Sequence, residues 1–127
     1  MMENFTHLHV HTEYSVLDGA SNIKKLIGRA KEHGMKAIAI TDHGNMFGVK
    51  EFHNEAKTLG IKPIIGCEIY VAKGNRTDRT DKNDRGYHLT LLAKNKTGYK
   101  NLIKIVSYSW IDGFYYNPRA DKELLRK

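Results

Sequence analysis

Short apolar runs alternate with longer stretches of helical periodicity along this chain. The runs of strand length cover residues 5–10, 37–41, 63–72 and 87–93. Between and after them, apolar residues recur every three or four positions over residues 21–34, 46–59 and 97–111. Because strands and helices alternate in this way around a shared sheet, the pattern predicts an α/β protein.

Polar caps and glycines mark where the predicted helices begin and end. Ser21 is placed to cap the first helix, and Gly34 and Gly60 follow the last periodic residues of the first and second. The second helix is expected to turn four residues inward: Phe47, Phe52, Ala56 and Leu59. The third is expected to present one apolar face: Tyr99, Leu102, Ile103, Val106 and Trp110. A further helix is expected to begin near Asp121, with Leu124 and Leu125 lacking any downstream segment to pack against.

The strand predicted at residues 63–72 differs from a half-exposed strand. Its apolar residues show little alternation, which is typical of a strand buried on both faces of a parallel sheet. The segment that follows, residues 73–86, contains no large apolar residue and interleaves acids with bases. That composition predicts a mobile surface loop rather than an arm that binds nucleic acid.

Polar residues near strand ends favour a barrel over an open doubly wound sheet. His11, His43 and Glu68 are expected at or just beyond the ends of strands, and the carboxyl-terminal rim of a parallel barrel is where functional groups from several strands meet. No glycine-rich phosphate loop follows the first strand, which removes the commonest doubly wound nucleotide-binding folds. We therefore expect a barrel.

Composition restricts the setting of the protein. With 127 residues, of which 40% are hydrophobic, the chain can bury one core. No apolar stretch approaches the roughly 20 residues that cross a bilayer, and the first residues lack the features of a signal peptide. The single cysteine, Cys67, suits a reducing cytoplasm. A net charge of +7 permits a nucleic-acid partner, but the basic residues are too scattered to indicate one strongly.

Histidines and carboxylates occur at the spacing of metal ligands. His9 and His11 alternate along a predicted strand, so both imidazoles leave from one face. Glu68 is flanked by isoleucines and would be costly to bury without a cationic or metal partner. The candidate ligands are His9, His11, Asp18, His43, Glu68 and His88. This mixed nitrogen and oxygen set suits Zn, Mn or Fe, and a cluster of two or three such ions favours phosphoester hydrolysis.

Some of these candidates have an alternative interpretation. Asp18 precedes Gly19, so it is either a ligand or a turn residue, and His88 is either a ligand or a packed histidine within an apolar strand. His7 and Asp42 are candidates for supporting the ligands, His7 as their neighbour and Asp42 by orienting an imidazole.

Four short motifs carry a resemblance to a known family. His9-Val10-His11, Thr41-Asp42-His43-Gly44-Asn45, Gly66-Cys67-Glu68 and Tyr87-His88-Leu89 resemble the opening motifs of the polymerase and histidinol phosphatase (PHP) superfamily. The sequences at residues 14–19, 61–66, 91–95 and 113–119 are similar to the PHP domains that begin the alpha subunits of bacterial replicative DNA polymerase III. The resemblance covers nearly the whole chain.

The resemblance implies a fold and a metal site. PHP domains of this kind form a distorted, seven-stranded TIM-like (β/α) barrel with nine ligands around as many as three divalent ions, and six of those ligand positions match here. The remaining three ligands are expected beyond Lys127, so that residues 1–127 would form part of a PHP domain, without the polymerase domains and their Mg site. A partial barrel would expose strand edges, and we expect little activity from it alone.

The resemblance also leaves three functions to separate. The first is a metal-dependent 3'-to-5' exonuclease within a DNA polymerase, and the second is a non-catalytic scaffold domain of that polymerase. The third is a stand-alone phosphatase or amidohydrolase-like enzyme, which the match at residues 113–119 opposes. The implied partners are DNA and other replicase subunits, such as a sliding clamp, a proofreading subunit or a clamp loader, in the cytoplasm and without a membrane.

Overall fold

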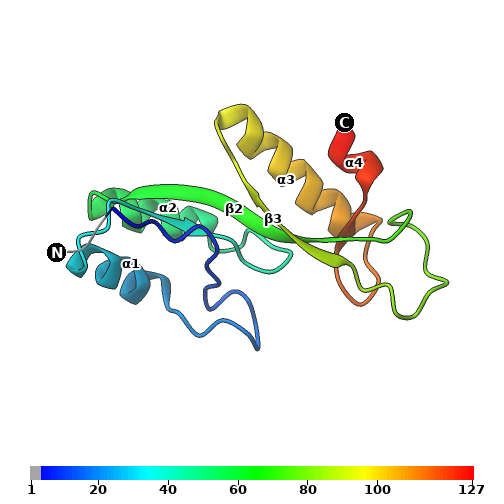
Figure 1. Cartoon of the computed structure of the whole chain (residues 1–127), viewed down its shortest axis with the longest axis horizontal. Coiled ribbons are helices and arrows are strands. Elements are labelled where there is room, and N and C mark those ends of the chain that lie inside the picture. Colours follow the sequence, from blue (N-terminus) through cyan, green and yellow to red (C-terminus); the bar gives the residue numbers. More distant parts are fainter. Residues whose placement is uncertain (1–3) are drawn as a thin grey trace.

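Helices and strands alternate along the chain, as the sequence predicts. The structure, a computed structural model, describes residues 4–127 (Figure 1). Its elements are α1 (Ile23–Glu32), β1 (Ala37–Ile40), α2 (Val49–Thr58), β2 (Lys62–Val71), β3 (Tyr87–Leu92), α3 (Lys96–Ile111), β4 (Arg119–Ala120) and α4 (Lys122–Arg126). Among residues 4–127, no helix combines the length and the apolar character that a membrane crossing requires.

Side-chain caps define three of the four helix starts. Asn22, rather than the predicted Ser21, caps α1 by accepting a hydrogen bond from the Lys25 backbone N–H (3.3 Å). Asn95 and Asp121 cap α3 and α4 in the same way. Helix α2 starts later than predicted, after Gly48, and has no side-chain cap. The predicted helices therefore exist, with boundaries that differ by one to three residues.

Strand β2 is the centre of a mixed sheet. It pairs in parallel with β1 along its first half and with β4 at its end, but β3 pairs with it antiparallel (Figure 1). The prediction of a parallel sheet is therefore wrong for β3. A parallel return needs a crossover segment, usually a helix, and the connection between β2 and β3 contains none.

The segment at residues 5–10, predicted as a strand, is extended but forms no regular ladder. It lies beside β1, where the N–H groups of Ala39 and Thr41 donate to the carbonyls of His7 (3.0 Å) and Val10 (2.8 Å). The two donors are two positions apart and their two acceptors are three positions apart, and the Val10 N–H bonds to the Thr41 hydroxyl (2.8 Å) instead of a carbonyl. This side-chain bond interrupts the ladder that the sequence predicts.

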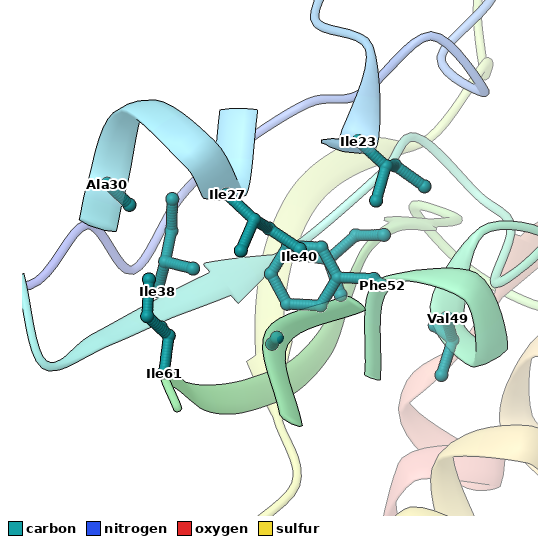
Figure 2. Close-up of a cluster of buried hydrophobic side chains, with 9 residues drawn as sticks. Ile23, Ile27, Ala30, Ile38, Ile40, Val49, Phe52 and Ile61 are labelled. Carbon is teal, nitrogen blue, oxygen red and sulfur yellow. The ribbon is translucent and has the colours of Figure 1, made fainter. Parts of the chain in front are cut away.

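The core consists of two apolar clusters on β2. The first packs α1 and α2 against β1 and contains Ile27, Ile38 and Phe52 (Figure 2). The second packs α3, β4 and α4 against the later part of β2, and Leu124 belongs to it with 9% of its surface exposed. Leu124 therefore packs against upstream residues.

Two predicted inward faces are only partly correct. Phe47 precedes the start of α2 and is 67% exposed, packing against the Trp110 ring instead of the core. On α3, Leu102 and Val106 are buried, whereas Tyr99, Ile103 and Trp110 are between 36% and 43% exposed. A helix on a sheet buries a narrower stripe than its apolar periodicity suggests.

Residues 73–86, predicted as a mobile surface loop, are anchored by a buried arginine. The Arg119 side chain is fully buried and donates to the carbonyls of Arg76 (2.8 Å), Asp78 (2.8 Å) and Asp84 (3.1 Å). The Asp84 carboxylate in turn accepts from the Lys73 N–H. Hydrogen bonds therefore hold this loop where apolar residues are missing.

Candidate metal centre

Glu68 is the buried centre of the candidate site. It lies within β2, not at a strand end as predicted, because β2 continues past β1 to pair with β3 and β4. Only 2% of its surface is exposed. Four imidazoles surround its carboxylate: His9 and His11 (2.9 Å) at Oε2, and His43 (3.2 Å) and His88 (2.7 Å) at Oε1.

The four histidines reach Glu68 from three segments. His9 and His11 come from the extended segment beside β1, as their alternation predicts. His43 follows β1 and forms an isolated parallel bridge with Glu68. His88 comes from β3, and the antiparallel return of that strand is what places it beside β2.

Asp18 joins the site from the loop after His11. Its Oδ2 lies 2.6 Å from Nε2 of His43 and 3.1 Å from Nδ1 of His11. The preceding residue, Leu17, has φ of 69°, a left-handed conformation that costs a non-glycine residue about 1–2 kcal/mol. The chain therefore accepts local strain at the turn that points Asp18 towards the histidines.

Asp42 holds this loop in place. Its buried carboxylate accepts hydrogen bonds from the Thr12 N–H (2.6 Å), the Thr12 hydroxyl (2.7 Å) and the Ser15 hydroxyl (2.8 Å). The Ser15 hydroxyl oxygen accepts from the His43 N–H (3.0 Å). Asp42 thus supports the site through the loop backbone instead of orienting an imidazole as predicted. Thr12 and Ser15 carry no signal of this role in the sequence, because a Thr-x-x-Ser pair is too common a pattern.

All six candidate ligands come together in three overlapping groups. Within each group the possible ligand atoms lie within 4.8 Å of one another. The groups are His9, His11 and Glu68; His11, Asp18 and His43; and His43, Glu68 and His88. Among the described residues, His7 belongs to none of these groups. Its ring is exposed and packs edge-on against Phe5.

The hydrogen-bond donors of this cluster do not match its acceptors. A neutral imidazole carries one N–H and one lone pair, yet His11 and His43 each turn both ring nitrogens towards carboxylates. Nδ1 of His43 is buried and has no hydrogen-bond partner, although it lies 3.2 Å from Glu68. A cation shared by a nitrogen lone pair and a carboxylate oxygen would satisfy both atoms, so the donor set fits a metal ion.

Glu68 and Asp18 both have the charge state that metal binding requires. Burial alone would raise the pKa of Glu68, but hydrogen bonds with His11 and His9 and the charge of His43 lower that pKa below its ordinary value. The hydrogen bond with His43 likewise lowers the pKa of Asp18. Both groups are therefore anionic at neutral pH, as metal ligands must be.

The cluster is closed on one side and open on the other. The side chains of Glu68, His43 and His11 are 3%, 18% and 22% exposed, whereas those of His9, His88 and Asp18 are 57% or 58% exposed. The buried carboxylate thus lies beneath the cluster, and three of the six candidate ligands face solvent.

Comparison with known proteins gives a family and a fold. Residues 7–127 match the family described as "PHP domain". The chain is 54% identical over 125 residues to the DNA polymerase III subunit alpha of Borreliella burgdorferi and 53% identical over 124 residues to that of Treponema pallidum. These matches cover 97% and 96% of this chain and 11% of either relative, so the chain spans about a tenth of their length.

A solved structure supports the predicted fold class. An amidohydrolase from Chromobacterium violaceum superposes with a TM-score of 0.50 at 24% sequence identity, covering 81% of this chain and 33% of that one. The α/β prediction is confirmed, and the family match agrees with part of a PHP-type barrel, whereas the all-parallel sheet is wrong.

Proposed function

Because the chain belongs to the PHP domain family, we propose that its six-residue cluster binds divalent metal ions and hydrolyses phosphoesters. The observation that carries this proposal is the donor imbalance around Glu68, which a bound cation would remove. Three overlapping ligand groups would allow as many as three ions, with His11, His43 and Glu68 each shared between two groups. Zn, Mn and Fe all suit this nitrogen and oxygen set.

The buried and the exposed residues of the site would have different roles in the proposed chemistry. When bound, divalent ions would act as Lewis acids on a phosphoryl oxygen and would lower the pKa of an attacking water. Glu68, His11 and His43 have the least exposed side chains of the six and would fix the ion positions. His9, Asp18 and His88 are exposed enough to face the substrate as well.

We further propose that the whole protein is a replicative DNA polymerase alpha subunit and that this site removes nucleotides from DNA 3' ends. Support comes from identities above 50% to two proteins named DNA polymerase III subunit alpha. DNA and other replicase subunits, including a sliding clamp, a proofreading subunit or a clamp loader, would then be its partners, and a separate Mg site would perform the polymerase reaction.

Residues 1–127 would form the first part of the PHP domain. The chain covers 33% of the amidohydrolase that shares its fold, and among residues 4–127 the strand β3 pairs with β2 alone. We propose that later strands complete the barrel against β3 and that further ligands come from them.

The test measures metal and nuclease activity together in a longer protein that includes the rest of the domain. We expect bound Zn or Mn by elemental analysis and metal-dependent release of nucleotides from a labelled single-stranded DNA 3' end. Glu68→Gln should abolish both, whereas His53→Ala, an exposed histidine on α2, should abolish neither.

Two other outcomes are informative. A protein without bound metal would contradict the proposed centre. Bound metal without nuclease activity, unchanged by His9→Ala and His11→Ala, would favour the scaffold function, in which the PHP domain only supports the polymerase.

A further inference from the structure

Tyr70 occupies a central place beside the candidate ligands, although no motif identifies it. It lies two residues after Glu68 on β2, so the two side chains leave from the same face of the strand. Its neighbours across the sheet are His88 on β3 and Arg119 on β4. Tyr70 is therefore fixed at the point where three strands meet.

The Tyr70 ring contacts two of the four imidazoles around Glu68. It stacks on His43 with ring centroids 6.1 Å apart and planes at 22°, and it meets His88 edge to face at 5.1 Å and 82°. These are also the two histidines whose Nδ1 atoms approach Oε1 of Glu68, at 3.2 and 2.7 Å. One aromatic ring thus lies against both ligands of one carboxylate oxygen.

The His88 imidazole contacts three groups although 57% of its side chain is exposed. Its Nδ1 lies 2.7 Å from Oε1 of Glu68, and its ring meets those of His43 and Tyr70 edge to face. Aromatic pairs prefer edge-to-face or offset geometry and resist rotation away from it. The Tyr70 ring therefore restricts the angle at which His88 presents Nδ1.

Tyr70 is itself held by close backbone packing. A Cβ added at Gly44, which has φ of 62°, would lie 3.1 Å from Cε2 of Tyr70 and 2.8 Å from Cγ of Pro118. A Cβ added at Gly86 would lie 2.7 Å from Cβ of Tyr70. The glycine that follows His43 thus allows the Tyr70 ring to pack directly against the ligand loop.

We propose that Tyr70 is a positioning residue of the metal centre, whose ring sets the orientation of His43 and His88 towards Oε1 of Glu68. This inference rests on the proposed metal-binding function. It assigns the ring, not the hydroxyl, as the active part, because the ring makes both contacts. Outer groups that orient metal ligands by hydrogen bonding typically change metal affinity 10- to 100-fold when they are altered, and the lower end of that range sets the scale for a ring that orients them by packing.

The test begins with the metal-free chain. Ring proton and carbon chemical shifts of His43, His88 and His9 are measured by NMR in the wild type, Tyr70→Leu and Tyr70→Phe. We expect Tyr70→Leu to shift the His43 and His88 signals and leave His9 unchanged, and Tyr70→Phe to keep the wild-type pattern. Tyr70→Met provides a second non-aromatic variant if Tyr70→Leu does not fold. Tyr87→Leu is the matched control, since Tyr87 is 64% exposed on β3 and pairs with Val71.

Zinc titration of the same variants, followed by calorimetry, gives the second measurement. We expect Tyr70→Leu to weaken Zn²⁺ binding on the order of tenfold, with wild-type affinity in Tyr70→Phe and Tyr87→Leu. Wild-type His43 and His88 signals in Tyr70→Leu, or unchanged zinc affinity in it, would overturn the inference. If the wild type bound no zinc while Tyr70→Leu still shifted His43 and His88, the metal proposal would fail and the positioning role would stand.

Discussion

Two buried charges on neighbouring strands, Arg119 on β4 and Glu68 on β2, have opposite kinds of surroundings. A guanidinium has five N–H donors, and Arg119 directs its nitrogens to the carbonyls of Gly113, Asp84, Arg76 and Asp78 and to the Asp84 carboxylate. Glu68 instead faces four imidazoles, two of which also turn their second nitrogen to Asp18. The arginine cluster is complete within the chain, and the glutamate cluster has more acceptors than donors.

The hydrogen-bond partners of the two charges indicate a structural role for Arg119 and a binding role for Glu68. A buried charge whose partners are all satisfied holds segments together, as Arg119 does for residues 73–86. A buried charge among groups that compete for the same protons is stable only if a further charge joins it. Burial alone would not have distinguished the two, because Arg119 and Glu68 are 0% and 2% exposed.

Removing the arginine should have the largest effect on stability. Arg119→Met would remove the guanidinium that bonds to four carbonyls and pairs with the buried Asp84 carboxylate, and we expect a loss of about 3–5 kcal/mol in the free energy of unfolding. Urea denaturation measures this loss. Arg29→Met is the control, because Arg29 makes an exposed pair with Glu32 (3.0 Å) and should cost no more than about 0.5 kcal/mol. Equal stability of the two variants would contradict the structural role of Arg119.

Asp42→Ala should have the next largest effect. It removes the acceptor of three buried hydrogen bonds that hold the Asp18 loop, and we expect a loss of about 2–3 kcal/mol together with weaker zinc binding. Asp78→Ala is matched to it, since Asp78 accepts the same pair of bonds from the N–H and hydroxyl of Thr80 at an exposed site. Thermal unfolding should separate the two variants clearly, and similar melting temperatures would contradict the anchoring role of Asp42.

Glu68→Gln should differ from Arg119→Met by changing the stability of the metal-free protein little while abolishing zinc binding. The amide can still bond to the surrounding imidazoles, so we expect the metal-free protein to change by no more than about 1 kcal/mol. Zinc affinity should nevertheless be lost, because the shared anionic ligand is gone. Parallel denaturation and calorimetry test this, and a metal-free loss as large as that of Arg119→Met would show that Glu68 is structural.

Acid titration provides the smallest and most specific test. Burial alone would raise the pKa of Asp121, but hydrogen bonds from the backbone N–H groups of Arg76 and Leu124 and the charge of Arg76 lower it below the ordinary value of 3.8. The unfolded chain therefore binds the proton first as pH falls, so this stabilisation is complete above about pH 4 and is lost as pH falls through the folded pKa.

The corresponding variant is Asp121→Asn. Urea midpoints measured between about pH 2 and 5 should show a shallower decrease in this variant than in the wild type. An identical pH dependence in both proteins would mean that Asp121 does not contribute to acid unfolding.

The candidate ligands were predictable where a residue carries its own local signal. His9 and His11 alternate along the chain, and Glu68 is an isolated carboxylate among apolar residues. Asp18 and His88 were ambiguous from the residues alone, because a turn aspartate and a packed histidine have the same local sequence. Their place in the cluster depends on the Leu17 turn and on the antiparallel return of β3.

The anchoring residues could not be predicted in the same way. Arg119 bonds to residues of the 73–86 loop that lie 35 to 43 positions away, and Asp42 bonds to Thr12 and Ser15 across 30 and 27 positions. Nothing near Arg119 distinguishes it from an exposed arginine, and residues 73–86 have the composition of a mobile loop because their stability comes from outside the segment.

The amino-acid sequence by itself determined the α/β class, the candidate ligands and the family, because strand and helix periods and ligand types are properties of neighbouring residues. Only the tertiary structure decided the direction of β3, the anchoring of residues 73–86 and the place of Tyr70 between His43 and His88. Those features depend on which donors and acceptors become neighbours when distant segments fold together. Whether a buried group finds enough donors and acceptors is decided only in the folded chain. Here that count distinguishes Arg119, which stabilises the fold, from Glu68, which we propose binds a metal.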